Sequence, residues 1–92
     1  LAAGLVKLEP YMSYRLLAPT SLEKRVMAAL GKLSASVESV VFTGEEMEAR
    51  GQVAYDIAKE FPVDLRTMTG GQGIFEMTFL EYRRVNAVHF DG

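Results

Sequence analysis

Apolar and polar residues alternate from Met47 to Ile57, and this pattern constrains the fold of the 92-residue chain more than any other feature of its sequence. Successive side chains of a β-strand point to opposite faces of a sheet, so a period of two over this length predicts one long strand with a buried face. Gly51 in its middle predicts a bulge or close packing against a helix. The expected buried face holds Met47, Ala49, Gly51, Val53, Tyr55 and Ile57, and the other face holds Glu48, Arg50, Gln52 and Asp56.

Three further stretches have the composition of strands. Residues Leu8 to Leu17 alternate after Pro10. Near the end of the chain, Phe75, Met77 and Phe79 alternate with Glu76, Thr78 and Leu80, which predicts a final strand that ends near Tyr82. Residues Val37 to Thr43 are rich in β-branched and aromatic side chains. The glycine-containing turn that follows them predicts a hairpin with the long strand.

Two stretches predict helices. Apolar residues recur at helical spacing from Leu22 to Leu33, and Thr20 and Glu23 have the spacing of a capping box at the helix start. A shorter helix is expected over Ala58 to Met68, with Pro62 in the first turn, where the missing N–H costs nothing. The order strand, helix, strand, strand, helix, strand predicts an α+β, ferredoxin-like split βαβ sandwich. In this fold a four-stranded antiparallel sheet carries two helices on one face.

The composition excludes several classes of protein. Hydrophobic residues make up 49% and charged residues 24%, a balance typical of folded globular domains. The chain has no cysteine, which excludes disulfides and thiolate metal sites and favours a reducing compartment. A formal net charge of −2 lacks the basic excess of an independent nucleic-acid-binding domain, and no apolar run reaches membrane-spanning length. We therefore expect a soluble, cytoplasmic chain with neither a membrane nor DNA as partner.

Candidates for catalysis and metal binding are few. His89 is the single histidine and lies in a stretch without a pattern. The acidic cluster Glu45, Glu46 and Glu48 surrounds the expected hairpin turn, where solvated carboxylates are common. The stretch Gly70-Gly71-Gln72-Gly73 follows a helix and lacks the Lys-Ser/Thr of a P-loop. We expect no catalytic residue, no metal site and no cofactor in this chain.

The best candidate for a binding site is the stretch from Asp64 to Phe75. It predicts the end of a helix, a glycine-rich loop and a strand, which together gather Arg66, two hydroxyls and several backbone amides. Such a loop can follow a phosphate backbone closely because glycine has no Cβ, although the same pattern is typical of ordinary helix ends. An RNA-recognition module would need aromatic residues on the third strand, which the alternation does not provide. A small-molecule-binding regulatory ferredoxin-like domain remains an alternative.

Three passages resemble the C-terminal domain of elongation factor G and its relatives, the tetracycline-resistance ribosomal protection proteins. They are Leu8-Glu9-Pro10-Tyr11-Met12-Ser13-Tyr14 followed by Ala18-Pro19, residues Gly44 to Val53 with Glu48-Ala49-Arg50-Gly51, and Asp64-Leu65-Arg66-Thr67-Met68-Thr69-Gly70-Gly71-Gln72-Gly73-Ile74-Phe75. The third is similar to the most distinctive short motif of the family. The Glu-Pro-Tyr passage is closest to the ribosomal protection branch, while the Gly-x-Gly loop is more similar to the elongation factor. A translocase, a ribosomal protection protein and a looser paralogue all remain open.

The resemblance implies a non-catalytic ribosome-docking domain of a translational GTPase. The GTPase domain, with GTP and magnesium, would belong to the parent chain and lie outside this sequence. The partners would be large-subunit rRNA near the sarcin–ricin loop, the stalk base and the other domains of the parent. The expected rRNA-binding residues are Arg66, Thr67, Thr69, Gly70, Gly71, Gln72 and Gly73. Arg66 would pair with phosphate while hydroxyls and glycine amides donate hydrogen bonds. Gln72 departs from the family, since the elongation factor commonly has a basic residue there.

The same resemblance divides the chain into three parts. Residues 1–7 would be a remnant of a preceding domain or a linker, residues 8–83 the elongation factor G C-terminal-like domain, and residues 84–92 a tail.

Overall fold

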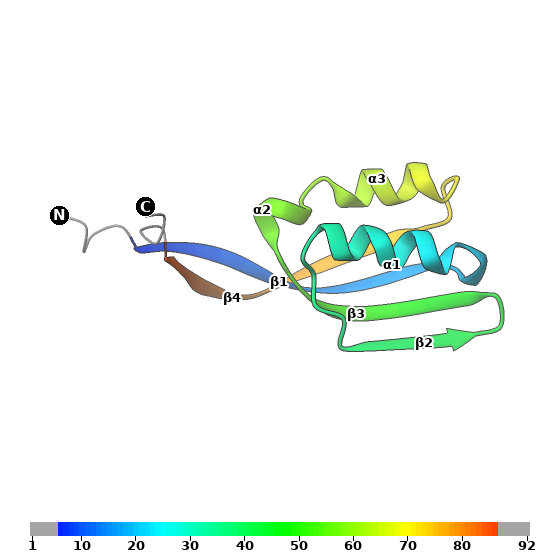
Figure 1. The fold of residues 1–92 in the computed structure, drawn as a ribbon, viewed down its shortest axis with the longest axis horizontal. Helices are drawn as coiled ribbons and strands as arrows, with labels where there is room; N and C mark the ends of the chain where they lie inside the picture. Colours follow the sequence, from blue (N-terminus) through cyan, green and yellow to red (C-terminus); the bar gives the residue numbers. More distant parts are fainter. Residues whose placement is uncertain (1–5, 87–92) are drawn as a thin grey trace.

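A four-stranded antiparallel sheet forms one layer of the molecule, and the helices form a second layer on one of its faces (Figure 1). The structure is a computed structural model that describes residues 6–86, with the side chains of residues 8–84. The elements in order are β1 (Val6–Pro19), the 3-10 turn η2 (Thr20–Leu22), α1 (Glu23–Lys32), β2 (Ser39–Thr43), β3 (Glu46–Ala54), α2 (Tyr55–Ala58), α3 (Phe61–Met68) and β4 (Ile74–Asn86). The strand order in the sheet is β2-β3-β1-β4. The ferredoxin-like α+β fold is therefore confirmed.

Strand β1 is central, because it pairs with β3 on one side and with β4 on the other. From Tyr14 onward its side chains at even positions lie under the helices and are almost fully buried, with exposed fractions of 2% for Tyr14, 0% for Leu16 and 1% for Ala18. The pairing puts β3 and β4 residues of the same kind beside them, which builds the core between sheet and helices. That core consists of Tyr14, Leu16, Ala18, Val26, Leu30, Met47, Ala49, Val53, Ala58, Phe61, Leu65 and Phe75.

Gly51 allows the connection between α1 and β2 to approach the sheet. A Cβ atom at this position would lie 1.9 Å from the Ser36 carbonyl oxygen. The Tyr14 hydroxyl donates a 2.7 Å hydrogen bond to that oxygen, and burial raises the pKa of Tyr14 to about 12, so the phenol keeps its proton. Of the bulge or close packing against a helix predicted at Gly51, only the close packing is present. Its partner is this connection rather than a helix, and the β1–β3 register has no bulge there.

The long strand is shorter than the alternation predicted. β3 ends at Ala54, and the chain turns into the one-turn helix α2, which places Ala58 in the core. Tyr55 and Ile57 are therefore exposed by 39% and 51%, and the prediction that they lie on the buried face is wrong. Asp56 likewise belongs to α2 and not to the strand. A polar residue between two apolar ones fits the outside of a helical turn as well as a strand, so the pattern could not separate the two.

The predicted capping box is also wrong. A 3-10 turn precedes α1, so the helix begins at Glu23, and the residue before it, Leu22, makes no side-chain cap. The backbone N–H of Thr20 donates to the Glu45 carbonyl oxygen at 2.7 Å, which ties the turn to the β2–β3 hairpin. The Thr20 hydroxyl is buried and has no hydrogen-bond partner within the described part of the chain. The tie to the hairpin thus replaces the cap.

The outer strands run past the limits that the sequence indicated. β1 begins at Val6, and β4 continues to Asn86 rather than ending near Tyr82. The β1–β4 register shifts between Tyr11 and Met12, so β4 has a bulge at Leu80. This bulge explains why the alternation in the sequence fades after residue 79. The division of the chain into linker, domain and tail stays a prediction, and His89 lies outside the described residues.

The contact at Gly51 predicts a large loss of stability for Gly51→Ala. A Cβ only 1.9 Å from a backbone oxygen cannot be relieved by rotating a side chain, so the connection or β3 must move. We expect the free energy of unfolding to fall by more than about 2 kcal/mol, measured by urea denaturation.

Gly31→Ala is the matched control. Gly31 lies in α1, and an added Cβ would have no atom within 4 Å apart from its chain neighbours and the backbone of its own helix. Because alanine favours a helix over glycine, this variant should be unchanged or more stable by up to about 1 kcal/mol. Equal stability of the two variants would show that the backbone contact does not hold in solution.

Candidate functional site

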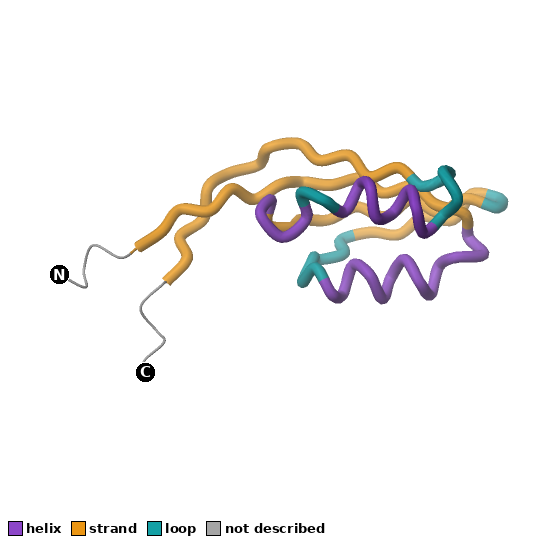
Figure 2. The backbone as a smooth tube through the Cα atoms, turned by 90° about the horizontal axis from the view of Figure 1, so that it is seen from above, coloured by secondary structure: helices purple, strands orange, loops and turns teal. Residues whose placement is uncertain are grey.

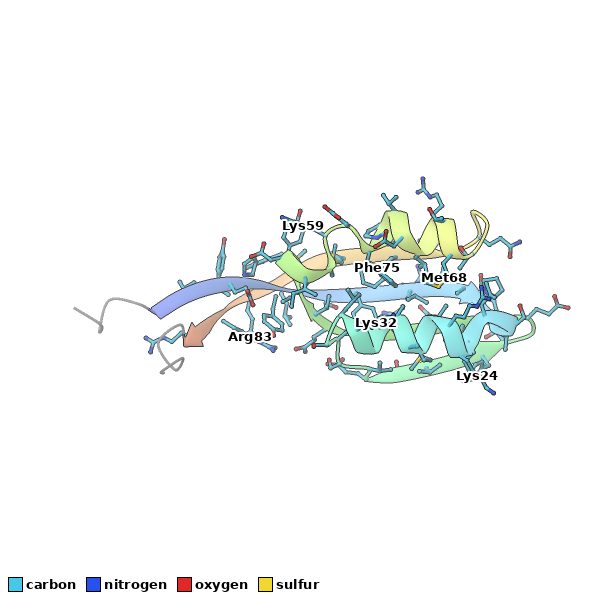
Figure 3. The ribbon with its side chains drawn as sticks, turned by 45° about the horizontal axis from the view of Figure 1, so that its top comes forward. Lys24, Lys32, Lys59, Met68, Phe75 and Arg83 are labelled. Carbon is cyan, nitrogen blue, oxygen red and sulfur yellow. The ribbon has the colours of Figure 1, made fainter. Side chains whose placement is uncertain are left out.

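The packing of α3 on the sheet decides which of its residues reach the surface. Phe61 and Leu65 are buried, and the Phe61 ring meets the Phe75 ring edge to face with centroids 4.9 Å apart. Figure 3 shows Phe75 beneath α3 and Met68 at the end of α3 that leads into the loop. Arg66 and Thr67 fall on the outward side of the same turn and are exposed.

Thr69 closes the loop that follows α3. Its hydroxyl donates a 2.8 Å hydrogen bond to the Leu65 carbonyl oxygen and accepts a 2.6 Å hydrogen bond from the Gly73 N–H. Thr69 is only 5% exposed. Gly73 is buried as well, and a Cβ there would lie 2.7 Å from the Leu65 Cγ. These two predicted site residues therefore face the protein interior and hold the loop in shape.

The backbone amides of the loop already have partners. The Gly70 N–H donates to Thr67, the Gly71 N–H to Arg66 and the Gln72 N–H to Thr69, at 3.4, 2.8 and 3.3 Å from the carbonyl oxygens. Gly70 and Gly71 have φ angles of 65° and 91°, which glycine adopts without strain. The sequence suggested that these amides are free to bind phosphate. In the structure these amides donate hydrogen bonds to carbonyl oxygens at the end of α3 and are not free, so that suggestion is wrong.

The remaining predicted site residues lie together on the surface. Arg66, Thr67, Gly70, Gly71 and Gln72 are all exposed. The described ion pairs involve Arg15, Arg50 and Arg83, and Arg66 belongs to none of them. We call these five exposed residues the loop surface. It offers a guanidinium, a hydroxyl and a side-chain amide next to backbone without bulky side chains.

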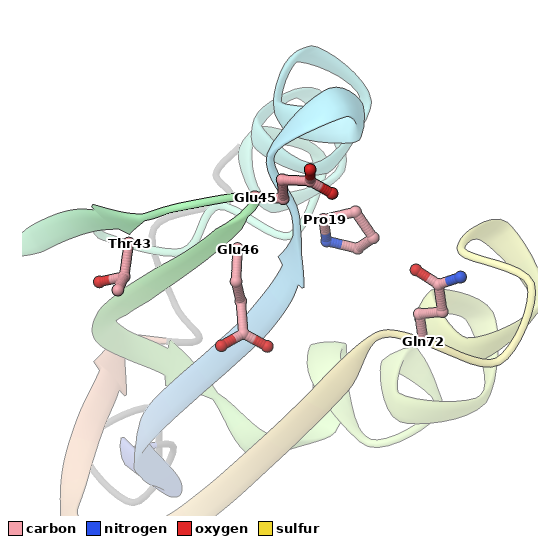
Figure 4. A pocket seen from close by; sticks show the side chains of 5 residues that line it. All are labelled: Pro19, Thr43, Glu45, Glu46 and Gln72. Carbon is pink, nitrogen blue, oxygen red and sulfur yellow. The ribbon is translucent and has the colours of Figure 1, made fainter.

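A shallow pocket of about 260 Å³ lies beside the loop surface (Figure 4). It is formed where the end of β1, the β2–β3 turn and the loop meet, and its lining residues are Pro19, Thr43, Glu45, Glu46 and Gln72. The two carboxylates disfavour an anion on this side of the loop. A phosphate would therefore approach the loop surface from the side of Arg66.

The open face of the sheet carries a network of charges that the sequence did not reveal. The Arg15 Nε donates to the Glu48 carboxylate at 2.6 Å, and the Arg15 Nη1 reaches Glu76 at 3.3 Å. Arg50 contacts the same Glu48 oxygen at 2.9 Å. The hydrogen bond from Arg15 lowers the pKa of Glu48 below its ordinary value. Alternation placed Glu48 and Arg50 on this face correctly, but the pairing of Arg15 with Glu48 and Glu76 requires the strand register.

Tyr11, an aromatic residue on the open face, is also covered by another side chain of this face. The Arg83 guanidinium lies 4.1 Å from the centre of the Tyr11 ring and pairs with Glu81 at 2.7 Å. Arg83 also donates a hydrogen bond to the Gln52 side chain. These contacts engage the arginines and the Tyr11 ring of this face, so the ring is covered where a nucleic-acid base would stack.

Within residues 6–86, no group of three or more His, Cys, Asp and Glu side chains could hold a metal ion. Over the same range, no helix is long and apolar enough to cross a membrane.

Comparison with known proteins confirms the resemblance found in the sequence. A family model described as elongation factor G C-terminus matches residues 6–92. The tetracycline resistance protein TetP of Clostridium perfringens is 25% identical over 85 residues, which are 92% of this chain and 13% of that protein. A crystal structure of a Thermus thermophilus protein has a TM-score of 0.79 and 24% identity, covers 89% of this chain and 12% of its own, and supports the fold.

This chain thus corresponds to about an eighth of the length of these two proteins. The matches do not favour the alternative of a small-molecule-binding regulatory domain. Whether the loop surface contacts RNA stays a prediction.

The hydrogen bonds of Thr69 predict that Thr69→Ala loosens the loop. The substitution leaves the buried Gly73 N–H without a partner, which costs about 1–3 kcal/mol in the free energy of unfolding. Hydrogen exchange of the Gly73 amide should be accelerated accordingly.

Thr67→Ala is the control, because Thr67 lies two residues earlier and is exposed. It should change the free energy of unfolding by less than about 0.5 kcal/mol. Thr69→Ser should retain most of the stability, and similar losses for Thr67→Ala and Thr69→Ala would contradict the role given to Thr69.

The lowered pKa of Glu48 predicts a contribution to stability that acid removes. A carboxylate with a lowered pKa in the folded state stabilises the fold above its ordinary pKa, and the effect is lost as the pH falls through the lowered value. Glu48→Gln should therefore be less stable than the native chain near neutral pH, and the difference should shrink on acidification. Urea unfolding from pH 7 to pH 3 measures this difference in the free energy of unfolding.

Glu46→Gln is the control, because Glu46 is exposed and in none of the described ion pairs. A Glu48→Gln difference that does not vary with pH would refute the assignment.

Proposed function

Because this chain belongs to the elongation factor G C-terminus family, we propose that it is the domain by which a translational GTPase docks on the ribosome. The loop surface would contact large-subunit rRNA near the sarcin–ricin loop, close to the stalk base. The observation that carries this proposal is the exposed Arg66, which lies outside the described ion pairs and beside a loop that is fixed from within.

The electrostatics of α3 explain why the contact would depend on Arg66. The C-terminal end of a helix carries a partial negative charge, so it does not attract phosphate by itself. Arg66 lies in the last turn of α3, where its guanidinium offsets this charge and can bind a phosphate through two parallel hydrogen bonds. Arg66 is thus the residue that would give this helix end its affinity for RNA.

The other residues of the loop surface would act through shape and hydrogen bonding. Gly70 and Gly71 carry no side chain, so an RNA backbone can approach the loop closely. The hydroxyl of Thr67 and the amide of Gln72 can donate hydrogen bonds to phosphate or ribose oxygens. Thr69 and Gly73 would contribute by holding this surface rigid. Rigidity lowers the entropy cost of binding.

The chemistry of the whole protein would lie in the rest of the parent chain. The curated relative and the solved structure are far longer than this chain, and we assign GTP binding and hydrolysis, with magnesium, to the part that this sequence does not include. The role of this domain would be to position that GTPase on the ribosome. A modest formal charge of −2 suits a module that makes one of several contacts.

Among the members of the family we favour a ribosomal protection protein. The passage Glu9-Pro10-Tyr11 and the match to a tetracycline resistance protein support this choice. Expression of the parent gene in a tetracycline-sensitive bacterium should then raise the concentration of drug needed to stop growth. No rise in a strain that accumulates the folded protein would leave a translocase or a paralogue as the better description.

The role of Arg66 predicts the outcome of a binding experiment with the parent protein. Arg66→Glu replaces a phosphate-binding cation by an anion, and affinity for 70S ribosomes should fall by a factor of about ten or more. Co-sedimentation at several salt concentrations should show a smaller dependence on salt for the variant, since fewer counterions are released.

Lys59→Glu is the matched control, because it makes the same change of charge at the other end of α3 (Figure 3). It should bind ribosomes nearly as well as the native protein. Thermal unfolding of both variants verifies that they are folded. If Arg66→Glu binds as tightly as Lys59→Glu, the loop surface is not the ribosome contact.

A further inference from the structure

Strands β1 and β4 continue beyond the helices as a two-stranded ribbon. In this ribbon Val6 pairs with Asn86, Leu8 with Arg84 and Pro10 with Tyr82. Figures 1 and 2 show that the helical layer ends near α2, while the two strands run on toward the ends of the chain. An isolated two-stranded ribbon is marginally stable in water at best.

The two faces of this ribbon differ in character. The face that continues the open face of the sheet is polar, with Arg83 held by Glu81 and by the Tyr11 ring. The face that continues the helix side also carries the exposed Arg84, opposite Leu8, but is otherwise largely apolar. Its apolar side chains are among the most exposed hydrophobic residues of the described chain. Leu8 is 58% exposed, Phe79 53% and Tyr82 62%. We call these three residues the ribbon patch.

The bulge at Leu80 creates the ribbon patch. In a regular strand, residues three apart point to opposite faces, so Phe79 and Tyr82 would be separated. The register shift puts both on the helix side, Phe79 opposite Met12 and Tyr82 opposite Pro10. Their rings lie 5.1 Å apart. Without the bulge, Tyr82 would join the polar face, so the bulge extends the apolar side of the sheet where no helix covers it.

We propose that the polypeptide preceding Val6 in the parent protein covers the ribbon patch with an apolar surface of its own. This inference rests on the longer parent chain of the proposed function. The matching family is described as a C-terminus and the two relatives are about eight times longer, so most of the absent length would precede this domain. The preceding polypeptide would then connect to this domain at the tip of the ribbon, where β1 begins at Val6.

The covalent connection makes a small patch sufficient. A neighbouring domain linked at Val6 is held at high effective concentration beside the ribbon, so a modest apolar contact can keep it in place. Interfaces between domains of one chain bury roughly 600–1,500 Å² and are less apolar than obligate ones. The ribbon patch would be the apolar centre of such an interface, with Arg83 and Glu81 kept in water on the opposite face.

The exposure of two tyrosines provides an internal test in the parent protein. Tyr82 is 62% exposed and Tyr55 39% exposed in this domain, so an uncovered ribbon would be labelled by hydroxyl radicals faster at Tyr82. If the preceding polypeptide covers the patch, this order reverses and Tyr82 is labelled more slowly than Tyr55. Labelling that is as fast at Tyr82 as at Tyr55, or faster, overturns the proposal.

A second measurement identifies what covers the patch. In the parent protein, Tyr82→p-benzoylphenylalanine should form photo-cross-links within one molecule to peptides that precede Val6. The same substitution at Val63, a similarly exposed residue on α3, serves as the control and should not give those products. Cross-links between two molecules, lost on dilution, would mean that a second copy covers the patch and would refute the proposal. Both measurements are made without ribosomes, so they succeed or fail independently of the Arg66 experiment.

Discussion

The pairing of β1 with both β3 and β4 is the constraint on which the rest of this structure depends. Because β1 is hydrogen-bonded on both sides, the alternation of its side chains sets which face of all three strands is buried. Tyr14 shows the consequence, since its ring stacks on Phe75 of β4 while its hydroxyl holds the connection that crosses Gly51 of β3. A shift of the β1 register by one residue would turn Tyr14 and Leu16 to the open face and put Arg15 in the core.

The sequence predicts the fold where the physical signal is local and fails where partners are distant. Met47 to Val53 alternate as expected, and the strand order follows from the sequence of elements. The exposure of Tyr55 and Ile57 could not be predicted, because one helical turn and two strand residues share the same pattern. The absence of a cap at Thr20 could not be predicted either, because its backbone is tied to Glu45, which is far away in the sequence. The face on which Tyr82 lies depends on a bulge that only the β1–β4 register reveals.

The candidate site shows the same division. The sequence brought Arg66 and the glycines together, and the structure places Arg66, Thr67 and Gly70 to Gln72 on one surface. The sequence alone could not show that Thr69 is buried. A threonine four residues after Leu65 at a helix end nevertheless often donates a hydrogen bond back to the Leu65 carbonyl oxygen. The loop therefore separates two tasks. Internal hydrogen bonds fix its shape, and the exposed guanidinium and small residues are left to a partner.

The most direct test of this account is a map of the RNA near the loop surface. The chain has no cysteine, so Gln72→Cys offers a single attachment point in this domain for an iron chelate that releases hydroxyl radicals. In the parent protein, freed of any other cysteine and bound to ribosomes, the account predicts cleavage of large-subunit rRNA around the sarcin–ricin loop. A chelate attached through Lys59→Cys should cut there weakly. Absence of cleavage from position 72, or equal cleavage from both positions, would contradict the claim that this loop faces the ribosome.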